Sequence, residues 1–427
     1  MFEKLAVIDT EADEATLIDC IAELEHLKSV AAAGQARLTA ALDQKRRARE
    51  ASEGVPAAKL GRGLANEIAL ARHDSPNRGG RHLGFARALI HEMPHTLAAL
   101  EAGALSEWRA TLIVRESACL SVEDRGKLDA EMCAAQSELE GKGDKRIAAD
   151  AKAIAYRLDP QAVVDRAVRA ERERTVTIRP APDTMAYVTA LLPMTRGVSV
   201  YAALKHAADT TFDNRGRGQV MADTLYERVT GQPADVPVPV AVDLVMDDDT
   251  LFGGGPSPAR VPGYGPIPAA VARRLTSDAI ADKRSRATLR RLYRRPSSGA
   301  LVAMESRARL FPKALAKFIA LRDDTCRTPY CDAPIRHTDH AAPHAAGGAT
   351  SEVNGVGACA ACNFAKEARG WRVVTGRSGD GVHTSEVTTP TGARHRSKAP
   401  PLPGSPHTRA SRIETAFADV LGWRDAA

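Results

Sequence analysis

The chain has 427 residues, which is too long for one compact core, so two or three domains are expected. Its hydrophobic content of 44% and charged content of 26% are those of a soluble globular protein. No apolar run reaches the ~20 residues that a membrane span needs. The acidic N-terminus lacks the basic start of a secretory signal, so a cytoplasmic protein with no membrane partner is expected.

Charge is distributed unevenly along the chain. Residues 1–270 contain 33 basic and 39 acidic side chains, whereas residues 271–427 contain 26 and 14. The densest basic run covers residues 272–295. This asymmetry predicts a polyanionic partner for the C-terminal part, although a solvated basic helix face explains an isolated run equally well.

Residues 1–172 have the pattern of a helical body. Apolar residues recur at three- and four-residue steps, as over residues 15–50, and Ala, Leu, Glu and Arg are frequent. Pro94 is expected to break one helix and Ser106 to cap the next. The Ala and Leu stripes are expected to form a core, and we find no catalytic constellation in this part.

The pattern changes near residue 174. Residues 174–193 alternate apolar and polar side chains, which is typical of strands. Residues 201–231 return to a helical pattern, and residues 236–253 resemble another strand. Residues 253–268 then form a connector rich in Gly and Pro.

These patterns predict a multidomain, mainly α protein. The expected parts are a helical body (1–172), a small α+β part of the same body (173–270), a basic helical connector (271–300), a C-terminal domain (301–392) and a flexible basic tail (393–427).

Four of the seven cysteines lie within 37 residues. Cys326 and Cys331 form one pair, Cys359 and Cys362 form another, and 27 residues separate the pairs. In a reducing compartment such a cluster indicates a metal rather than disulfides. Four thiolates suit tetrahedral zinc in a closed, structural site, which would stabilise a domain too small for a large core.

A second set of polar residues lies around the second cysteine pair. It contains Asp339, His340, His344 and Asn354, with Asn363 directly after the last cysteine. Carboxylate and amide oxygens favour Mg²⁺ or Mn²⁺ over zinc. A histidine beside such an ion can take a proton from water that attacks a phosphodiester. From spacing alone, the alternative that Asp339 and His340 are only the polar end of a strand, with no catalytic role, stays open.

Residues 322–371 resemble the HNH nuclease motif, a ββα-metal fold, in the version that carries a structural zinc knuckle. Four further segments, at residues 99–110, 169–193, 217–231 and 263–275, resemble recurring segments of actinobacterial proteins whose N-terminal part is called domain of unknown function 222 (DUF222). The resemblance covers roughly residues 15–395. The HNH segment implies chemistry, whereas the N-terminal segments imply only the family.

The resemblance implies a role for each motif position. Asp339 is expected to bind a divalent ion, His340 to act as general base, Asn354 to fix the loop that holds the histidine, and Asn363 to be the second metal ligand. Most relatives carry histidine at the position of Asn363 and another histidine in place of Cys362, so this chain has a variant set.

Three basic residues near the motif are candidate phosphate contacts, although a solvated surface role is expected equally for each: Lys366, Arg336 and Arg369.

The predicted function is that of a DNA endonuclease that hydrolyses phosphodiester bonds with one catalytic Mg²⁺ or Mn²⁺ ion and a structural Zn²⁺. Two alternatives stay open. In the first, the protein would bind nucleic acid without cutting it and would use the zinc fold only as a scaffold. In the second, its helical body would recruit a protein partner. The complete Asp, His, Asn, Asn set favours the nuclease, and the sequence leaves the oligomeric state open.

Overall fold

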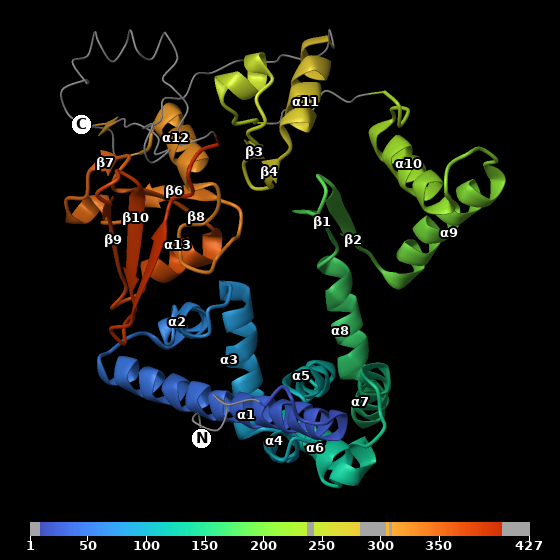
Figure 1. Ribbon diagram of the computed structural model, residues 1–427. Helices are drawn as coiled ribbons and strands as arrows, with labels where there is room; N and C mark the ends of the chain where they lie inside the picture. The colour runs from blue at the N-terminus through green and yellow to red at the C-terminus, as the bar shows by residue number, and fades with distance from the viewer. Residues whose placement is uncertain (1–8, 237–242, 282–304, 307–309, 404–427) are drawn as a thin grey trace. The chain divides into compact units, whose positions relative to one another are not determined.

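The computed structural model describes residues 9–236, 243–281, 305–306 and 310–403 (Figure 1). Helices make up 55% of the structure and its sheets are small, which confirms the mainly α class. The chain forms two compact units, Met1–Arg172 and Glu173–Ala427.

The first unit is helical along its described length. Its α-helices are α1 (Glu14–Ser52), α2 (Leu64–Ala71), α3 (Pro76–His91), α4 (Pro94–Glu101), α5 (Glu107–Glu116), α6 (Val122–Cys133), α7 (Asp144–Leu158) and α8 (Pro160–Arg172), with short 3-10 turns η2 (Ala57–Lys59) and η3 (Gln136–Leu139). Helix α1 packs against α3 and α4, and α2 packs against α3. The helical pattern predicted for this part is therefore confirmed.

An apolar core joins these helices. Small side chains of α1 pack against larger ones from α3 to α7. The buried members include Ala32, Ala33, Ala36, Ala40, Leu89, Leu100, Ile113, Leu128 and Ile147. Alanines at three- and four-residue steps let the long helix α1 approach its neighbours closely, as the sequence pattern predicted.

Helix ends follow from local sequence and from one distant carboxylate. Pro94 is the first residue of α4, and the Ser106 hydroxyl accepts a hydrogen bond from the backbone of α5, both as predicted. Asp129 on α6 accepts hydrogen bonds of 2.7 Å from the backbone N–H groups of His95 and Thr96. It therefore caps α4 from another helix.

The second unit begins with two strands, as the alternation after residue 174 predicted, and they form an antiparallel hairpin. Its first elements are β1 (Thr175–Pro180), β2 (Ala186–Leu191), α9 (Met194–Thr210), α10 (Arg217–Thr230), the π-helical turn η4 (Asp249–Gly253), β3 (Ala259–Val261), β4 (Gly265–Ile267) and α11 (Ala269–Ala281). Strands β1 and β2 pair with each other, β3 pairs with β4, and α9 packs against α10.

In its described residues, the rest of the second unit contains short strands and two α-helices. In chain order these are β5 (Glu305–Ser306), α12 (Lys313–Asp323), β6 (His337–His340), the 3-10 turn η5 (His344–Ala346), β7 (Thr350–Ser351), β8 (Gly355–Ala358), α13 (Ala360–Lys366), β9 (Arg372–Arg377), β10 (His383–Thr388) and β11 (Arg394–Lys398). Strand β5 pairs with β7, β6 pairs with β8, and the last three strands form a sheet in the order β11–β10–β9.

Two local predictions near residue 250 need correction. The Gly/Pro-rich connector contains the β3–β4 hairpin, whose turn uses positive φ angles at Gly263 and Gly265. Of the strand predicted over 236–253, the described part shows one bridge, between Val245 and Arg260, followed by η4. Residues 237–242 lie outside the described part of the chain.

The flexible tail predicted from residue 393 is wrong for its first residues. Residues 394–398 form β11, which pairs antiparallel with β10. Alternating exposed and half-buried residues in this strand show the period of two that the Pro- and Ser-rich surroundings obscured. Most of the basic connector, from residue 282 to 300, and the tail after residue 403 lie outside the described residues.

A buried ion network fixes α12 to β8. Arg322 and Asp323 form an ion pair at 2.7 Å. Asp323 accepts the backbone N–H of Gly357 at 2.7 Å, and Arg322 donates to the carbonyl of Gly355 at 2.8 Å. A Cβ atom at Gly357 would lie 2.4 Å from the Cδ1 atom of Ile335, so any larger residue at this position of β8 would displace the Ile335 side chain. Since buried charges are stable only when paired, this network positions β8 and with it β6.

His383 joins the C-terminal sheet to this network. Its side chain is buried, and its Nε2 atom lies 2.9 Å from the carbonyl oxygen of Val353. Burial lowers the pKa of His383 to about 4, and the charges of Arg322 and Arg327 act in the same direction, while Asp323 opposes them. His383 is therefore neutral in the folded protein at pH 7.

The second unit should lose stability as the pH falls from 6.5 to 4. His383 binds a proton more weakly in the folded than in the unfolded chain, so its contribution to stability is fully present above pH 6.5. Between pH 6.5 and pH 4 the free energy of unfolding should fall by about 3 kcal/mol. Hydrogen exchange of residues 372–398, corrected for its intrinsic pH dependence, measures this loss. His383→Gln should flatten the profile, and equal profiles for the two proteins would contradict the assignment.

Candidate functional site

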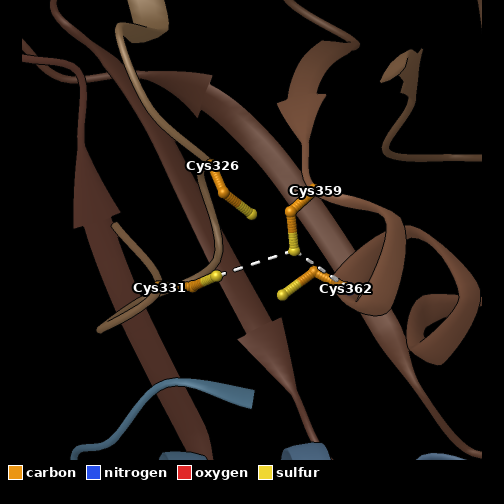
Figure 2. Close-up of side chains that lie close together, drawn as sticks. All are labelled: Cys326, Cys331, Cys359 and Cys362. Atoms are coloured by element: carbon orange, nitrogen blue, oxygen red, sulfur yellow. Dashed lines mark hydrogen bonds between the residues drawn. The ribbon is translucent and has the colours of Figure 1, made fainter. Parts of the chain in front are cut away.

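The four clustered cysteines converge from two segments of the chain (Figure 2). Cys326 and Cys331 follow α12, whereas Cys359 and Cys362 lie at the start of α13. All are buried, their sulfur atoms lie within 4.8 Å of one another, and the Cys331 and Cys359 sulfurs are 3.7 Å apart. Tetrahedral zinc, with Zn–S bonds of about 2.3 Å, places its sulfurs about 3.8 Å apart. The group can therefore hold a zinc ion.

The four thiols change one another's ionisation. Hydrogen bonds with Cys331 and, to a smaller extent, Cys362 lower the pKa of Cys326 to about 7, although the hydrogen bond with Cys359 and burial oppose them. Hydrogen bonds from Cys326 and the other two thiols lower the pKa of Cys359, while hydrogen bonding and burial raise the pKa of Cys331 and Cys362. Four thiols at this distance cannot all ionise unless a cation compensates their charge.

Asp339 and His340 lie at the end of β6. This strand pairs with β8, and α13 follows β8 and packs against β6. Asp339 Oδ1 accepts the backbone N–H of His340 at 2.8 Å, and Asp339 Oδ2 lies 2.9 Å from Lys366 Nζ. Burial raises the pKa of Asp339, but the hydrogen bonds from Lys366 and from the His340 backbone outweigh it and hold the pKa below its usual value. Asp339 is therefore an anionic oxygen donor at neutral pH.

The imidazole of His340 is held from several sides. Its Nε2 atom lies 2.9 Å from Thr350 Oγ1, its Nδ1 atom lies 3.6 Å from Asp339 Oδ1, and the Phe311 ring centroid is 4.6 Å away. The His340 side chain is 8% exposed, and burial lowers its pKa although Asp339 opposes this. The ring is thus uncharged at pH 7 and can accept a proton.

Asn354 closes the loop that follows His340. Its Oδ1 atom accepts the backbone N–H of Ala342 at 2.9 Å, and its Nδ2 atom donates to the carbonyl oxygens of Ala342 and Ala349 at 3.0 and 2.8 Å. Its backbone carbonyl accepts the N–H of Ala341. The amide side chain therefore ties both ends of the loop together and fixes the backbone just after His340.

Asn363 lies in α13, on the element that packs against β6. Its Oδ1 atom is buried and has no hydrogen-bond partner among the residues that the structure describes. Such an acceptor costs free energy unless another donor or a cation satisfies it. From the same helix, Lys366 Nζ donates to the His340 carbonyl at 2.9 Å in addition to its ion pair with Asp339. The structure thus places Lys366 within the candidate site.

The two arginines predicted as phosphate contacts lie at the surface. Arg336 is exposed just before β6, and Arg369 is exposed just after α13. Thr350 and Phe311, in contrast, contact His340 and were not singled out from the sequence. Each comes from a separate segment, and a single sequence carries no signal for such a contact.

Comparison with protein families identifies most of the chain. The family model described as domain of unknown function, DUF222, matches residues 19–323. The chain belongs to the DUF222 family. The match ends just before Cys326, so membership of DUF222 says nothing about the cysteine cluster or the β6–β8–α13 site. Neither the curated proteins nor the solved structures give a match.

Among the described residues of this DUF222 protein, no helix combines the length and the apolar character that crossing a bilayer demands.

Proposed function

We propose that the C-terminal part of this DUF222 protein is a metal-dependent DNA endonuclease of the HNH type. Two antiparallel strands followed by a helix, β6, β8 and α13, carry Asp339, His340 and Asn363. Asn354 clamps the loop after His340. The cysteine group can hold the zinc ion of the knuckle. These features support the proposal because the candidate base and the candidate anionic ligand end strand β6, and the candidate amide ligand belongs to α13, which packs against that strand.

The observation that carries the proposal is the buried Oδ1 atom of Asn363. Carboxylate and amide oxygens are hard donors that suit Mg²⁺ or Mn²⁺, and Asp339 supplies the carboxylate on the strand against which α13 packs. A divalent ion held by Asp339 and Asn363 would satisfy the orphaned acceptor. When bound, such an ion supplies the positive charge that a pentacovalent phosphate needs.

The remaining chemistry belongs to His340. Its neutral imidazole takes a proton from the attacking water, while Thr350 holds the Nε2 side of the ring. The water oxygen forms the new bond to phosphorus, the bond to the leaving oxygen breaks, and the leaving oxygen takes a proton from solvent. Asn354 keeps the backbone around the base in place, which favours the geometry of attack.

Variants of Asn363 test the proposal directly. Asn363→Ala should weaken Mn²⁺ binding by roughly tenfold or more and slow plasmid nicking, because one ligand is lost, whereas Asn363→Asp should retain binding through a carboxylate. Calorimetric titration with Mn²⁺ and nicking of supercoiled plasmid measure the two effects. Asn77→Ala, an exposed asparagine of α3, is the matched control. Equal Mn²⁺ binding by wild type and Asn363→Ala would remove the main support.

Thr350→Val should lower the rate of nicking without changing substrate binding. The substitution keeps the shape of a buried side chain but removes the hydroxyl that lies 2.9 Å from His340 Nε2. A less restrained base should reduce kcat by roughly 10- to 100-fold and leave KM nearly unchanged. Thr350→Ser should restore the rate under the same conditions, and a change in KM alone would argue against a positioning role.

The ion pair of Lys366 favours a second function. The ammonium already neutralises Asp339 at 2.9 Å, as expected of a site that binds nucleic acid through the zinc fold without cutting it. Lys366→Ala separates the two functions. A nuclease should keep or improve its Mn²⁺ affinity when this competing cation is removed, whereas a pure binding protein should show no metal-dependent nicking in either form.

A further inference from the structure

The C-terminal sheet has one strongly basic face. In its register, Glu386 of β10 lies between Val374 of β9 and Arg396 of β11, and residues in direct register share a face. We call the set on this side the basic face; it consists of Arg372, Val374, Gly376, Thr384, Glu386, Thr388, Arg394, Arg396 and Lys398. It carries four cations and one carboxylate.

The cations of the basic face are exposed and mostly unpaired. Arg396 lies 2.5 Å from Glu386. Within the part of the chain that the structure describes, Arg372, Arg394 and Lys398 form no direct ion pair, although Lys398 is near enough to Asp380 to help lower the pKa of that carboxyl. Strand geometry spaces the three cations of β11 about 7 Å apart along one line. Unpaired like charges in a row repel one another, so an anionic partner would stabilise this arrangement.

The opposite face of the same sheet is covered and anchored to the cysteine segment. Arg327, which follows Cys326, donates to the carbonyl oxygen of Lys398 at 2.7 Å, and Ser397 Oγ donates to the carbonyl oxygen of Arg327 at 2.7 Å. Val387 of β10 is buried on this side. The basic face therefore lies on a backbone that is already fixed before binding, so little backbone entropy is lost when a partner binds.

We propose that the basic face binds the sugar–phosphate backbone of DNA. This inference rests on the proposed nuclease function and adds a substrate surface outside the β6–β8–α13 site. Arginine guanidinium groups bind phosphate oxygens with two hydrogen bonds, and evenly spaced cations suit a polymer with regularly repeated phosphates. The face has one exposed apolar side chain, Val374, which argues against an apolar protein partner. It contacts phosphates and therefore contributes affinity without sequence specificity.

The test replaces the three cations of β11 together, as Arg394→Gln, Arg396→Gln and Lys398→Gln. The matched control, Lys45→Gln, Lys145→Gln and Lys152→Gln, removes the same charge from exposed positions of the first unit. Binding of a labelled 30-base-pair duplex to the full-length protein is measured over a range of NaCl concentrations, without divalent ions. The β11 variant should bind roughly tenfold more weakly or worse, with a salt slope reduced by about 2–3, while the control should match wild type.

Each other outcome is decisive. Equal losses in the two triple variants would show a general charge effect and overturn the basic face, as would unchanged binding by the β11 variant. Wild type that binds no duplex would overturn the proposed nuclease as well as this surface. Binding of wild type to vesicles containing phosphatidylserine, with no binding to DNA, would assign the face to a membrane instead.

Discussion

Replacing Cys331 with Ser should remove zinc from the protein and unfold the region from Cys326 to Lys366, while the helices of the first unit stay folded. The four cysteines link the loop after α12 to the start of α13, which also carries Asn363. Structural zinc contributes roughly 10–16 kcal/mol in small zinc-binding peptides, as much as the whole stability of a typical domain. The short strands β6 and β8 cannot replace such a contribution.

Metal analysis and hydrogen exchange together measure this effect. Wild type should contain one zinc per chain, and peptides covering residues 326–366 should exchange slowly. In Cys331→Ser, or after treatment of wild type with a strong chelator, the same peptides should exchange at least roughly a hundredfold faster. Cys20→Ser, at an exposed position of α1, is the control and should change nothing. Slow exchange in zinc-free wild type would show that the fold does not depend on the metal.

Local sequence predicted the features that a few neighbouring residues determine. The cysteine pairs illustrate this, because each pair sets two ligands by itself and only one long-range contact is needed to bring the pairs together. The same holds for the start of α4 at Pro94 and the Ser106 cap. The resemblance to DUF222 was likewise sufficient for the family, which the match over residues 19–323 now shows.

Features that depend on contacts between distant segments were not predictable in this way. Thr350 reaches His340 only because β7 and β6 come together, and Asp129 caps α4 from α6. Strand β11 forms because β10 offers an edge to pair with, although its surroundings have the composition of a flexible tail. A single sequence shows propensities and spacing, whereas these features depend on which partner tertiary structure supplies.

His340→Ala should abolish most of the Mg²⁺- or Mn²⁺-dependent nicking of supercoiled plasmid. Removal of a general base typically costs roughly 10²- to 10⁴-fold in rate. The neutral, largely buried imidazole next to Asp339 has the environment of such a base. The first residue of the same strand provides a matched control, because His337 lies on β6 but is exposed, so His337→Ala should nick at the wild-type rate.

The comparison is informative only if folding and metal loading are equal. Zinc content and hydrogen exchange of residues 326–366 should therefore match among wild type, His340→Ala and His337→Ala, since His340 is not among the cysteine ligands. With these equal, loss of nicking in His340→Ala alone assigns the base to this imidazole. Nicking that survives in His340→Ala but stops with EDTA would place the base elsewhere. Zinc-loaded wild type that binds duplex DNA but never nicks it would favour the non-cleaving function, for which the ion pair between Lys366 and Asp339 gives the structural reason.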